Sequence, residues 1–445
     1  MQILFISLGC DKNLVDSEHM LGILTKKGYQ ITDDETEADI IVINTCCFIH
    51  DAKEESIENI LQMAEYRKSG SCKALLVTGC MAERYRQEII DEIPEVDAVL
   101  GTNSFDKIEQ AIEETLGGNS FQRYEELKGI PESKDGRIIT TGGSYEYLKI
   151  AEGCDKHCTY CIIPKLRGDF RSVPMEELLT EAAQMAEQGV KELILVAQET
   201  TVYGTDLYGK KSLHILLKEL CKIQGINWIR VLYCYPEEIY PELIETIRDE
   251  KKICHYLDLP IQHANDQILG RMGRRTSKQE LVDIITTLRR EIPDIALRTT
   301  LITGFPGETE EQHEELMQFV EDMRFDRLGV FTYSPEEDTP AALFDNQIDE
   351  EIKLDRQAEL MELQQDISLE KGEEKIGQTL LAVIEGKVAD ENAYVARTYA
   401  DTPSVDGYLF INTQETLITG DFVKARVTGS LEYDLIGELE DEYTE

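Results

Sequence analysis

The feature that most constrains this chain is a short run that contains Cys154, Cys158 and Cys161. Their C-x-x-x-C-x-x-C spacing can supply three thiolates to one four-iron cubane cluster. Three protein ligands leave the fourth iron free to bind a cofactor such as S-adenosylmethionine (SAM). The run therefore predicts radical chemistry at a 4Fe-4S cluster rather than simple electron transfer. A zinc site completed by His157 is the alternative, although a histidine directly beside Cys158 fits a tetrahedral site awkwardly.

The sequence around this run predicts an α/β fold in which parallel strands alternate with helices. Apolar runs separated by amphipathic stretches make residues 1–116 typical of a doubly wound parallel α/β domain. We expect its strands at 3–8, 40–43, 74–77 and 98–100, with helices at 16–27 and 53–68. Glycine, proline and charged residues predict a linker over 117–143.

Residues 144–371 repeat the alternation and predict a full or partial (β/α) barrel. We expect its strands at 147–151, 192–196, 229–232, 256–259, 296–300 and 327–331. The cysteine run directly follows the first of these strands, at the end where such barrels carry their function. The remaining segment, 372–445, predicts a small five-stranded all-β barrel. Its strand-like runs lie at 379–384, 393–396, 407–411, 422–427 and 433–437.

A second set of cysteines also follows predicted strands. Cys10, Cys46 and Cys80 each come directly after a strand of the first domain. Because the carboxyl ends of parallel strands share one edge of a sheet, we expect the three thiols to converge and hold a second cluster. The alternative is three small buried residues at strand ends. Cys47 rivals Cys46 as the third ligand, but the parallel with the Gly-Cys pairs at 9–10 and 79–80 favours Cys46.

Other residues at strand ends are candidates for contacts with the cofactor. Gln198 and Glu199 follow the second strand of the barrel, and we expect them to contact SAM. Tyr160, inside the cysteine run, either packs on the adenine or packs within the loop. The segments 260–263 and 303–308 are weaker candidates, with ordinary loop structure as the alternative. Cysteines without such a pattern are interpreted as ordinary core or surface residues: Cys72, Cys221, Cys234 and Cys254.

The formal net charge of −42 limits the possible partners. Free nucleic acid would be repelled, because phosphate binding needs clustered lysine and arginine, whereas a basic protein would be attracted. The alternative is that the acidity only keeps the protein soluble. The N-terminus has no basic segment typical of a signal peptide, and no apolar run reaches the ~18 residues of a membrane helix. We therefore expect a cytoplasmic protein without membrane contact.

The stretch GCDKHCTYCIIPKLRG at 153–168 resembles the radical-SAM methylthiotransferases, and the resemblance covers essentially the whole chain. It implies an N-terminal methylthiotransferase domain, a radical-SAM core and a C-terminal TRAM domain. It further implies that Cys10, Cys46 and Cys80 hold an auxiliary 4Fe-4S cluster beside the SAM-binding one. A low-potential electron donor such as flavodoxin or ferredoxin is implied as a partner.

Two branches of this family differ in substrate. One modifies an isopentenyl- or threonylcarbamoyl-adenosine in tRNA, and the other, the RimO type, modifies the β-carbon of an aspartate in small-subunit ribosomal protein S-twelve. The stretches GCDKNLVDSE at 9–18 and ARTYADTPSVDG at 396–407 resemble the RimO type. Family members often have Pro or Ser at the place of Asp11 and Gly at that of Cys47.

Charge distinguishes the two branches independently of the resemblance. Residues 372–445 contain 16 Asp or Glu and 5 Lys or Arg, a net charge of −11. A domain that holds RNA should be basic, whereas an acidic one suits a basic ribosomal protein. The sequence therefore favours S-twelve or the small ribosomal subunit as the substrate, and the tRNA activity remains the alternative.

Overall fold

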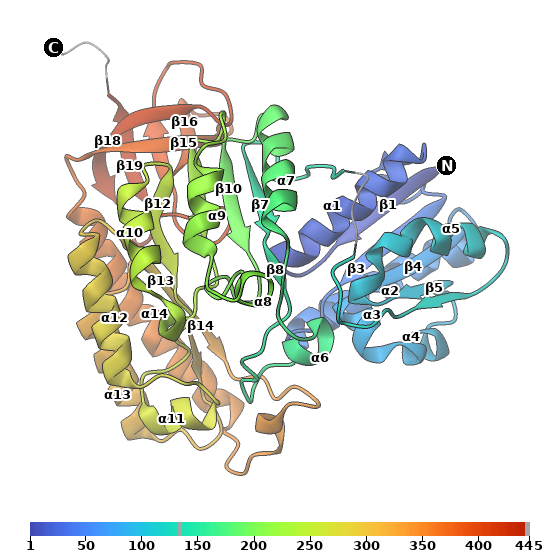
Figure 1. Cartoon of the computed structure of the whole chain (residues 1–445), viewed down its shortest axis with the longest axis horizontal. Helices are drawn as coiled ribbons and strands as arrows, with labels where there is room; N and C mark the ends of the chain where they lie inside the picture. The colour runs from blue at the N-terminus through green and yellow to red at the C-terminus, as the bar shows by residue number, and fades with distance from the viewer. Residues whose placement is uncertain (132–135, 441–445) are drawn as a thin grey trace.

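The structure, a computed structural model, describes residues 1–131 and 136–440. They form two parallel α/β units and a small closed β-barrel (Figure 1). The N-terminal unit lies to one side of the central unit, and the barrel packs against an end of the central unit. None of the helices in the described ranges is long and apolar enough to cross a bilayer.

The N-terminal unit is a six-stranded parallel sheet in the order β2-β1-β3-β4-β5-β6. Its strands are β1 (Gln2–Ser7), β2 (Gln30–Thr32), β3 (Ile40–Thr45), β4 (Ala74–Gly79), β5 (Ala98–Leu100) and β6 (Phe121–Arg123). Its helices are α1 (Asp11–Lys26), α2 (His50–Ser69), α3 (Cys80–Tyr85), α4 (Gln87–Glu92), the 3-10 helix η1 (Thr102–Lys107) and α5 (Ile108–Leu116).

Both faces of this sheet are covered. Every residue of β3 and β4 is buried, and successive side chains enter two different hydrophobic clusters. Ile41 and Val77 lie in one cluster, whereas Val42 and Leu76 lie in the other. Since a strand alternates its side chains between the two faces, both faces carry a core. The predicted doubly wound fold is confirmed.

Two local expectations for this unit are wrong. Helix α1 begins at Asp11 and not at residue 16, because Cys10 adopts an extended N-cap conformation (φ −88°, ψ 170°) directly before it. Its polar first turn hides the apolar periodicity that marks the rest of the helix. Strand β6 lies inside the predicted linker and pairs Phe121 with Ala98. It is only three residues long and largely polar, so no apolar run announces it.

The central unit is a parallel sheet in the order β14-β13-β12-β11-β10-β7. Its strands are β7 (Tyr145–Lys149), β10 (Glu192–Val196), β11 (Trp228–Val231), β12 (Ile253–Asp258), β13 (Ala296–Thr303) and β14 (Arg327–Thr332). All six predicted strands are present. Since β7 and β14 are the outermost strands of the sheet, the barrel is partial.

Helices cover the outer face of this sheet (Figure 1). They are α7 (Met175–Glu187), α9 (Leu213–Leu220), α10 (Pro241–Asp249), α12 (Lys278–Glu291), α13 (Glu310–Met323) and α14 (Glu350–Glu373). Ser277 and Thr309 begin α12 and α13 with capping boxes, which satisfy backbone N–H groups that lack helical partners. Shorter elements follow strand ends: β8 (Ala151–Glu152), α6 (Ile163–Arg167), β9 (Arg171–Ser172), α8 (Thr205–Tyr208), η2 (Pro236–Glu238), α11 (Asp266–Arg271) and η3 (Pro340–Leu343).

The C-terminal unit is a closed barrel in the order β15-β16-β17-β19-β18. Its strands are β15 (Thr379–Lys387), β16 (Ala393–Thr398), β17 (Leu409–Asn412), β18 (Phe422–Ser430) and β19 (Leu435–Leu439). Glu192, the first residue of β10, accepts hydrogen bonds from Arg230 (2.8 Å) and from Arg397 of the barrel (2.7 Å). All three side chains are at most 1% exposed. The barrel is thus fixed to the amino-terminal ends of the central strands, so the carboxyl ends are left to the cysteine loop.

Glu192→Leu should destabilise the protein strongly. It leaves two buried guanidinium groups short of their counter-charge, so we expect the free energy of unfolding to fall by about 3 kcal/mol. Glu438→Leu is the matched control, because Glu438 pairs with Arg426 where both side chains are at least half exposed. Loss of that pair should cost less than about 1 kcal/mol. Calorimetric melting compares the two variants, and equal melting temperatures would contradict the structural role of Glu192.

Candidate iron–sulfur and SAM site

The loop that carries Cys154, Cys158 and Cys161 lies beyond the carboxyl end of β7, between β8 and α6. Gly153 begins the loop with φ +81°, and a Cβ atom at this position would lie 2.1 Å from the carbonyl oxygen of Asp169. Only glycine fits such a conformation and such a close approach. The local backbone therefore holds the three cysteines against the segment that follows α6.

The three thiols of this loop lie close together. Burial raises the pKa of Cys154 to about 11, and the neighbouring Cys158 adds to the rise. Burial and Cys158 likewise raise the pKa of Cys161. In the part of the chain that the structure describes, no three His, Cys, Asp or Glu side chains are grouped tightly enough for a single ion. A cubane takes one thiolate on each of three irons, so its ligands lie farther apart than those of a single ion, and the three cysteines stay candidates for it.

The zinc alternative fits the loop poorly. His157, which would be its fourth ligand, is exposed, whereas Cys158 beside it is buried. The histidine adopts a left-handed backbone conformation with φ +52°, which turns the chain between two of the cysteines. The residues present therefore suit three thiolates on a cluster better than a tetrahedral ion.

Glu199 presents a carboxylate with unused hydrogen-bonding capacity beside this loop. The residue is 1% exposed, and among the described residues neither carboxylate oxygen has a hydrogen-bond partner. Its nearest cation is Lys156, whose Nζ lies 3.4 Å from Oε2. Burial raises the pKa of Glu199 to about 7. A buried acceptor of this kind suits a ligand that brings its own donors, such as the ammonium group of SAM.

Gln198, the other predicted SAM contact of this strand end, has both amide groups engaged within the protein. Its Nε2 donates to Glu152 Oε1 at 2.8 Å, and its Oε1 accepts from the Gly153 N–H at 2.8 Å. The side chain thereby ties the end of β10 to the first residue of the cysteine loop. The structure gives Gln198 a positioning contact with the loop.

Arg274 is a residue that the sequence reasoning missed. Its guanidinium lies 4.4 Å above the Tyr235 ring, and Nη2 donates to the Pro260 carbonyl at 3.0 Å. The side chain is 1% exposed, yet Nε and Nη1 lack hydrogen-bond partners within the described chain. Together with Glu199 it offers a buried cation and a buried anion, which match the carboxylate and ammonium of the amino-acid end of SAM.

Tyr160 packs against side chains from other segments of the central unit. The ring lies against a small cluster that includes Met272 and Phe305, and its pKa is raised mainly by burial and by the nearby Cys158. The packing alternative therefore has a direct structural basis. Contact with the adenine stays a prediction.

The second set of cysteines converges at the carboxyl ends of three adjacent strands, β1, β3 and β4. Cys10 caps α1, Cys46 follows β3, and Cys80 begins α3. Gly9 has φ +88°, and a Cβ atom there would lie 2.7 Å from the Cβ of Cys46. The missing side chain at Gly9 thus lets the ends of β1 and β3 approach each other, as three thiolates on one cluster require.

Cys46 is better placed than Cys47 to complete this set. Burial raises the pKa of Cys46 to about 12, and both Cys80 and Cys10 contribute to the rise. The raised pKa of Cys47 has burial and Cys80 as its main causes. Cys47 is fully buried in the hydrophobic cluster on one face of the sheet. The contact of Cys46 with Gly9, next to Cys10, favours Cys46, and its role as the third ligand stays a prediction.

Arg167, in α6, connects the two cysteine sets. Its guanidinium donates to Asp16 Oδ2 at 2.8 Å and also to the Asn13 amide oxygen, and it approaches Cys80 Sγ at 3.6 Å. On the central side it meets Glu152 at 3.2 Å. Arg167 is only 2% exposed. The helix that follows the first cysteine set therefore contacts the second set directly.

Lys149 closes the same network from the end of β7. Its ammonium bonds Asp16 of α1 and lies 2.8 Å from Glu152. Burial alone would raise the pKa of Glu152. The adjacent cations Lys149 and Arg167 outweigh this effect and hold the pKa low, at about 2. Two cations and two carboxylates, all buried, join the N-terminal and central units at this point.

Among the weaker candidates, His263 has a structural contact, and a role for the segment 303–308 stays a prediction. His263 Nδ1 accepts the N–H groups of Ala264 and Asn265, both at 2.9 Å, so the ring caps its own turn. Cys234 belongs to the main core of the central unit. Cys72 lies in the core of the N-terminal unit, as expected for a cysteine without a pattern.

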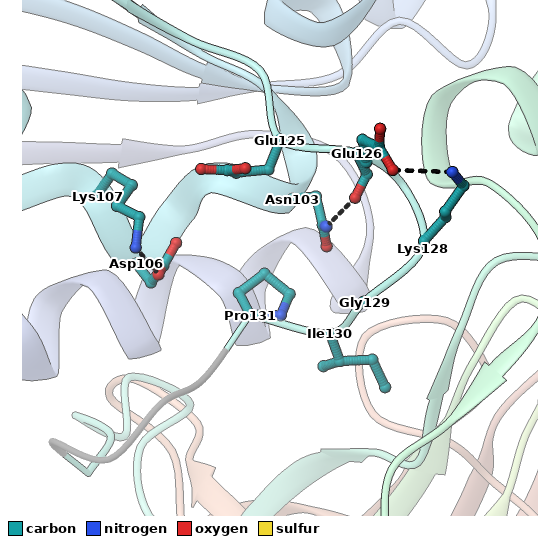
Figure 2. A pocket seen from close by; sticks show the side chains of 9 residues that line it. All are labelled: Asn103, Asp106, Lys107, Glu125, Glu126, Lys128, Gly129, Ile130 and Pro131. Atoms are coloured by element: carbon teal, nitrogen blue, oxygen red, sulfur yellow. Dashed lines mark hydrogen bonds and ion pairs between the residues drawn. The ribbon is translucent and has the colours of Figure 1, made fainter. Parts of the chain in front are cut away.

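A surface hollow of about 550 Å³ lies between η1 and the segment that follows β6 (Figure 2). It is lined by polar groups that already pair with one another, including Asp106 with Lys107 and Glu126 with Lys128. None of its lining residues is a cysteine. The hollow is therefore separate from the chemistry of both cysteine sets.

Three segments of the chain match known families. Residues 2–101 match the Uncharacterized protein family UPF0004, residues 148–320 the Radical SAM superfamily, and residues 376–439 the TRAM domain. Each match falls within one of the three structural units described above.

Curated relatives match over nearly the whole chain, and each is named ribosomal protein uS12 methylthiotransferase RimO. The protein from Lachnoclostridium phytofermentans is 63% identical, over 99% of this chain and 100% of its own length. A protein from Clostridium botulinum strain Hall is 50% identical over 98% of each chain. One from Clostridioides difficile strain 630 is 48% identical over 99% of each chain.

Solved structures show the same fold at low identity. The radical SAM methyltransferase TsrM from Kitasatospora setae, with cobalamin and a [4Fe-4S] cluster, has a TM-score of 0.56 at 12% identity, over 77% of this chain and 74% of that chain. The cobalamin-dependent radical enzyme OxsB has a TM-score of 0.51 at 14% identity, over 81% of this chain and 56% of that chain. These similarities concern the fold alone.

Iron content should distinguish Cys46 from Cys47. Anaerobically reconstituted protein should bind about eight irons, four for each cubane. Cys46→Ser should bind about four, because it removes a ligand of the second set, whereas Cys47→Ser should retain about eight. Iron and acid-labile sulfide analysis measures both. Loss of a cluster in Cys47→Ser alone would assign the third ligand to Cys47.

Binding of SAM should depend on the charge of Glu199. The ionised carboxylate attracts the ammonium group of SAM, whereas protonation removes its charge and one of its acceptors. The affinity for SAM should therefore fall as the pH drops below the pKa of about 7. Glu199→Gln should bind SAM more weakly in alkaline buffer and show a flatter pH profile. Equilibrium dialysis with the reconstituted protein measures this.

Glu238→Gln is the control for this measurement. Glu238 bonds the same lysine, Lys156, but Lys156 and Lys211 hold its pKa low despite its burial. Its substitution should leave the pH profile of SAM binding in place. A Glu199→Gln protein with the wild-type profile would rule out Glu199 as the titrating group.

Proposed function

Because the chain belongs to the RimO family of ribosomal protein uS12 methylthiotransferases, we propose that it attaches a methylthio group to the β-carbon of one aspartate of uS12, the protein S-twelve of the small subunit. Membership follows from 63% identity over 99% of the chain. The observation that carries the proposal is the pair of thiol sets, one at the end of each parallel sheet, joined by Arg167. One set serves radical generation, and the other serves sulfur transfer.

The cofactors are SAM and 4Fe-4S clusters, which are characteristic of this family. When bound, they supply a radical that breaks an unactivated C–H bond and a sulfur atom to replace the hydrogen. We assign Cys154, Cys158 and Cys161 to the cluster that binds SAM. Glu199 and Arg274 orient the amino-acid end of SAM through its ammonium and carboxylate groups.

We assign Cys10, Cys46 and Cys80 to the auxiliary cluster. Asn13 and Arg167 contact the Cys80 sulfur and fix it relative to the cysteine loop of the central unit. Because radical and sulfur must reach the same carbon atom, the distance between the two sets has to be held constant. The buried network of Arg167, Lys149, Asp16 and Glu152 provides that constraint.

The C-terminal barrel is suited to a basic protein partner. Arg397, one of its few cations, is fully buried between Glu192 and Glu385. The barrel also buries Asp401 and Asp406, so its surface keeps the acidic balance of its composition. Such a surface repels tRNA phosphate and attracts a ribosomal protein. Modification of tRNA is therefore not favoured. A cytoplasmic location and an electron donor such as flavodoxin or ferredoxin complete the proposal.

Methylthiolation of uS12 is the direct test. The reconstituted enzyme with SAM, a reductant and recombinant uS12 should add one methylthio group to a single aspartate, as measured by mass spectrometry of uS12 peptides. Cys10→Ala should cleave SAM but add no methylthio group, because it lacks the sulfur-donating cluster. Cys154→Ala should do neither.

Two results would contradict the proposal. Unmodified uS12 together with a methylthio-adenosine in tRNA would move the enzyme to the alternative branch. Methylthiolation of uS12 by Cys10→Ala would show that the second cysteine set does not deliver sulfur.

A further inference from the structure

An ammonium group lies between the two thiol sets without a role in holding either cofactor. Lys12 follows Cys10 by two residues, in the first turn of α1, and its side chain is 8% exposed. Its Nζ lies 2.7 Å from Asp11 Oδ1 and 3.2 Å from the centroid of the Tyr233 ring. Tyr233 comes from the central unit, just beyond the carboxyl end of β11. Lys12 thus reaches from the second thiol set to the mouth of the partial barrel.

The segment that follows β11 relates this ammonium to both thiol sets. Tyr233 meets Lys12 beside Cys10, and Tyr235, two residues later, places its hydroxyl 3.9 Å from Cys158 Sγ. Two residues of extended chain span about 7 Å. A group bound between the two sets therefore lies within reach of the Lys12 ammonium.

Tyr233 is held in an unusual conformation at this place. Its φ of +58° lies in the left-handed region, which a bulky residue adopts at a cost. Its N–H donates to Asp258 Oδ2 at 3.1 Å, which fixes the turn. Its hydroxyl donates to Asp11 at 3.4 Å. The strain keeps the aromatic face under Lys12, where the ring stabilises the ammonium without using any of its N–H donors.

Lys12 has donors to spare, unlike Lys149, Arg167 and Lys156, the other cations that contact carboxylates near the thiol sets. Lys149 contacts two carboxylates, Asp16 and Glu152, and Arg167 contacts the same two. Lys156 lies between Glu199 and Glu238. Within the described chain, Lys12 pairs with the carboxylate of Asp11 alone. An ammonium has three donors, so two remain for a ligand.

We propose that Lys12 binds the side-chain carboxylate of the substrate aspartate and thereby selects an acidic residue for modification. The inference rests on the proposed function and names the residue that recognises the substrate. A carboxylate that binds beside this buried ammonium loses water, and the cation replaces that water. The β-carbon is bonded directly to that carboxyl group, so fixing the carboxylate at Lys12 holds the β-carbon between the two thiol sets. Asp11 keeps the ammonium paired while the substrate is absent.

The test is a double-mutant cycle between enzyme and substrate, made with the full-length reconstituted enzyme and labelled uS12. Lys12→Met should weaken the binding of uS12, measured by fluorescence anisotropy, by about 30-fold, as expected for loss of one partner of a buried charge pair. A uS12 protein with asparagine at the target position should bind the wild-type enzyme with a similar loss. Because both changes remove the same contact, the two losses should not add.

Two enzyme variants serve as controls. Lys12→Arg keeps the positive charge and should recover part of the affinity. Lys73→Met removes a lysine that is more than half exposed and pairs with Asp39, just before β4 at the opposite edge of the sheet. It should bind uS12 as the wild type does, apart from the small effect of net charge.

Several outcomes would overturn the inference. One is that Lys12→Met binds uS12 as tightly as the wild type does. Another is that the losses of affinity caused by Lys12→Met and by asparagine in uS12 add fully when the two changes are combined. If Lys12→Met fails to take up iron, the comparison is made with the wild-type enzyme alone. Equal binding of the aspartate and asparagine forms of uS12 to that enzyme would exclude a carboxylate site. Failure of the wild-type enzyme to methylthiolate uS12 would instead overturn the proposed function, whatever Lys12 does.

Discussion

The arrangement of the whole molecule depends on the buried guanidinium of Arg167. It bonds Asp16 and Asn13 of the N-terminal unit and Glu152 of the central unit, and it contacts the sulfur of Cys80. A buried charge without its partners is costly by several kcal/mol, so the network tolerates little displacement. Because Arg167 belongs to the helix that directly follows the cysteine loop, the same contact that joins the units also sets the relation between the two thiol sets.

Parallel sheets explain why both thiol sets lie where they do. The carboxyl ends of parallel strands and the turns that follow them gather at one edge, which is where such folds place their ligands. In this protein two such edges are joined through α6 and the residues around Arg167. The C-terminal barrel is anchored elsewhere, at the amino-terminal ends of the central strands, through Glu192, Arg230 and Arg397. Chemistry and the acidic barrel therefore occupy different ends of the partial barrel.

Much of this could be predicted from the sequence, and the exceptions have physical reasons. Long apolar runs identified the six central strands, and cysteines after strands identified the thiol sets, because thiols are rare and chemically distinctive. Strand β6 was missed because three residues, two of them polar, are too few to show a periodicity. The contact of Gln198 with SAM stays a prediction, and the structure adds that its amide bonds Glu152 and Gly153, which no pattern in the sequence indicates. Arg274 was missed because one arginine in a basic loop gives no sign that its donors will be buried and unpaired.

The sequence alone determined the chemistry of this protein: the spacing of Cys154, Cys158 and Cys161, the placement of Cys10, Cys46 and Cys80 after strands, and the acidity of the last domain. The cysteine spacings are local features of the chain, and the acidity follows from counting its charged residues. Only the tertiary structure decided which groups meet. It brought Cys46 against Gly9 beside Cys10, joined the two units through Arg167, and placed Lys12 against Tyr233 across more than two hundred residues of chain. Such contacts depend on how separate sheets pack together, and no spacing within the sequence encodes that directly.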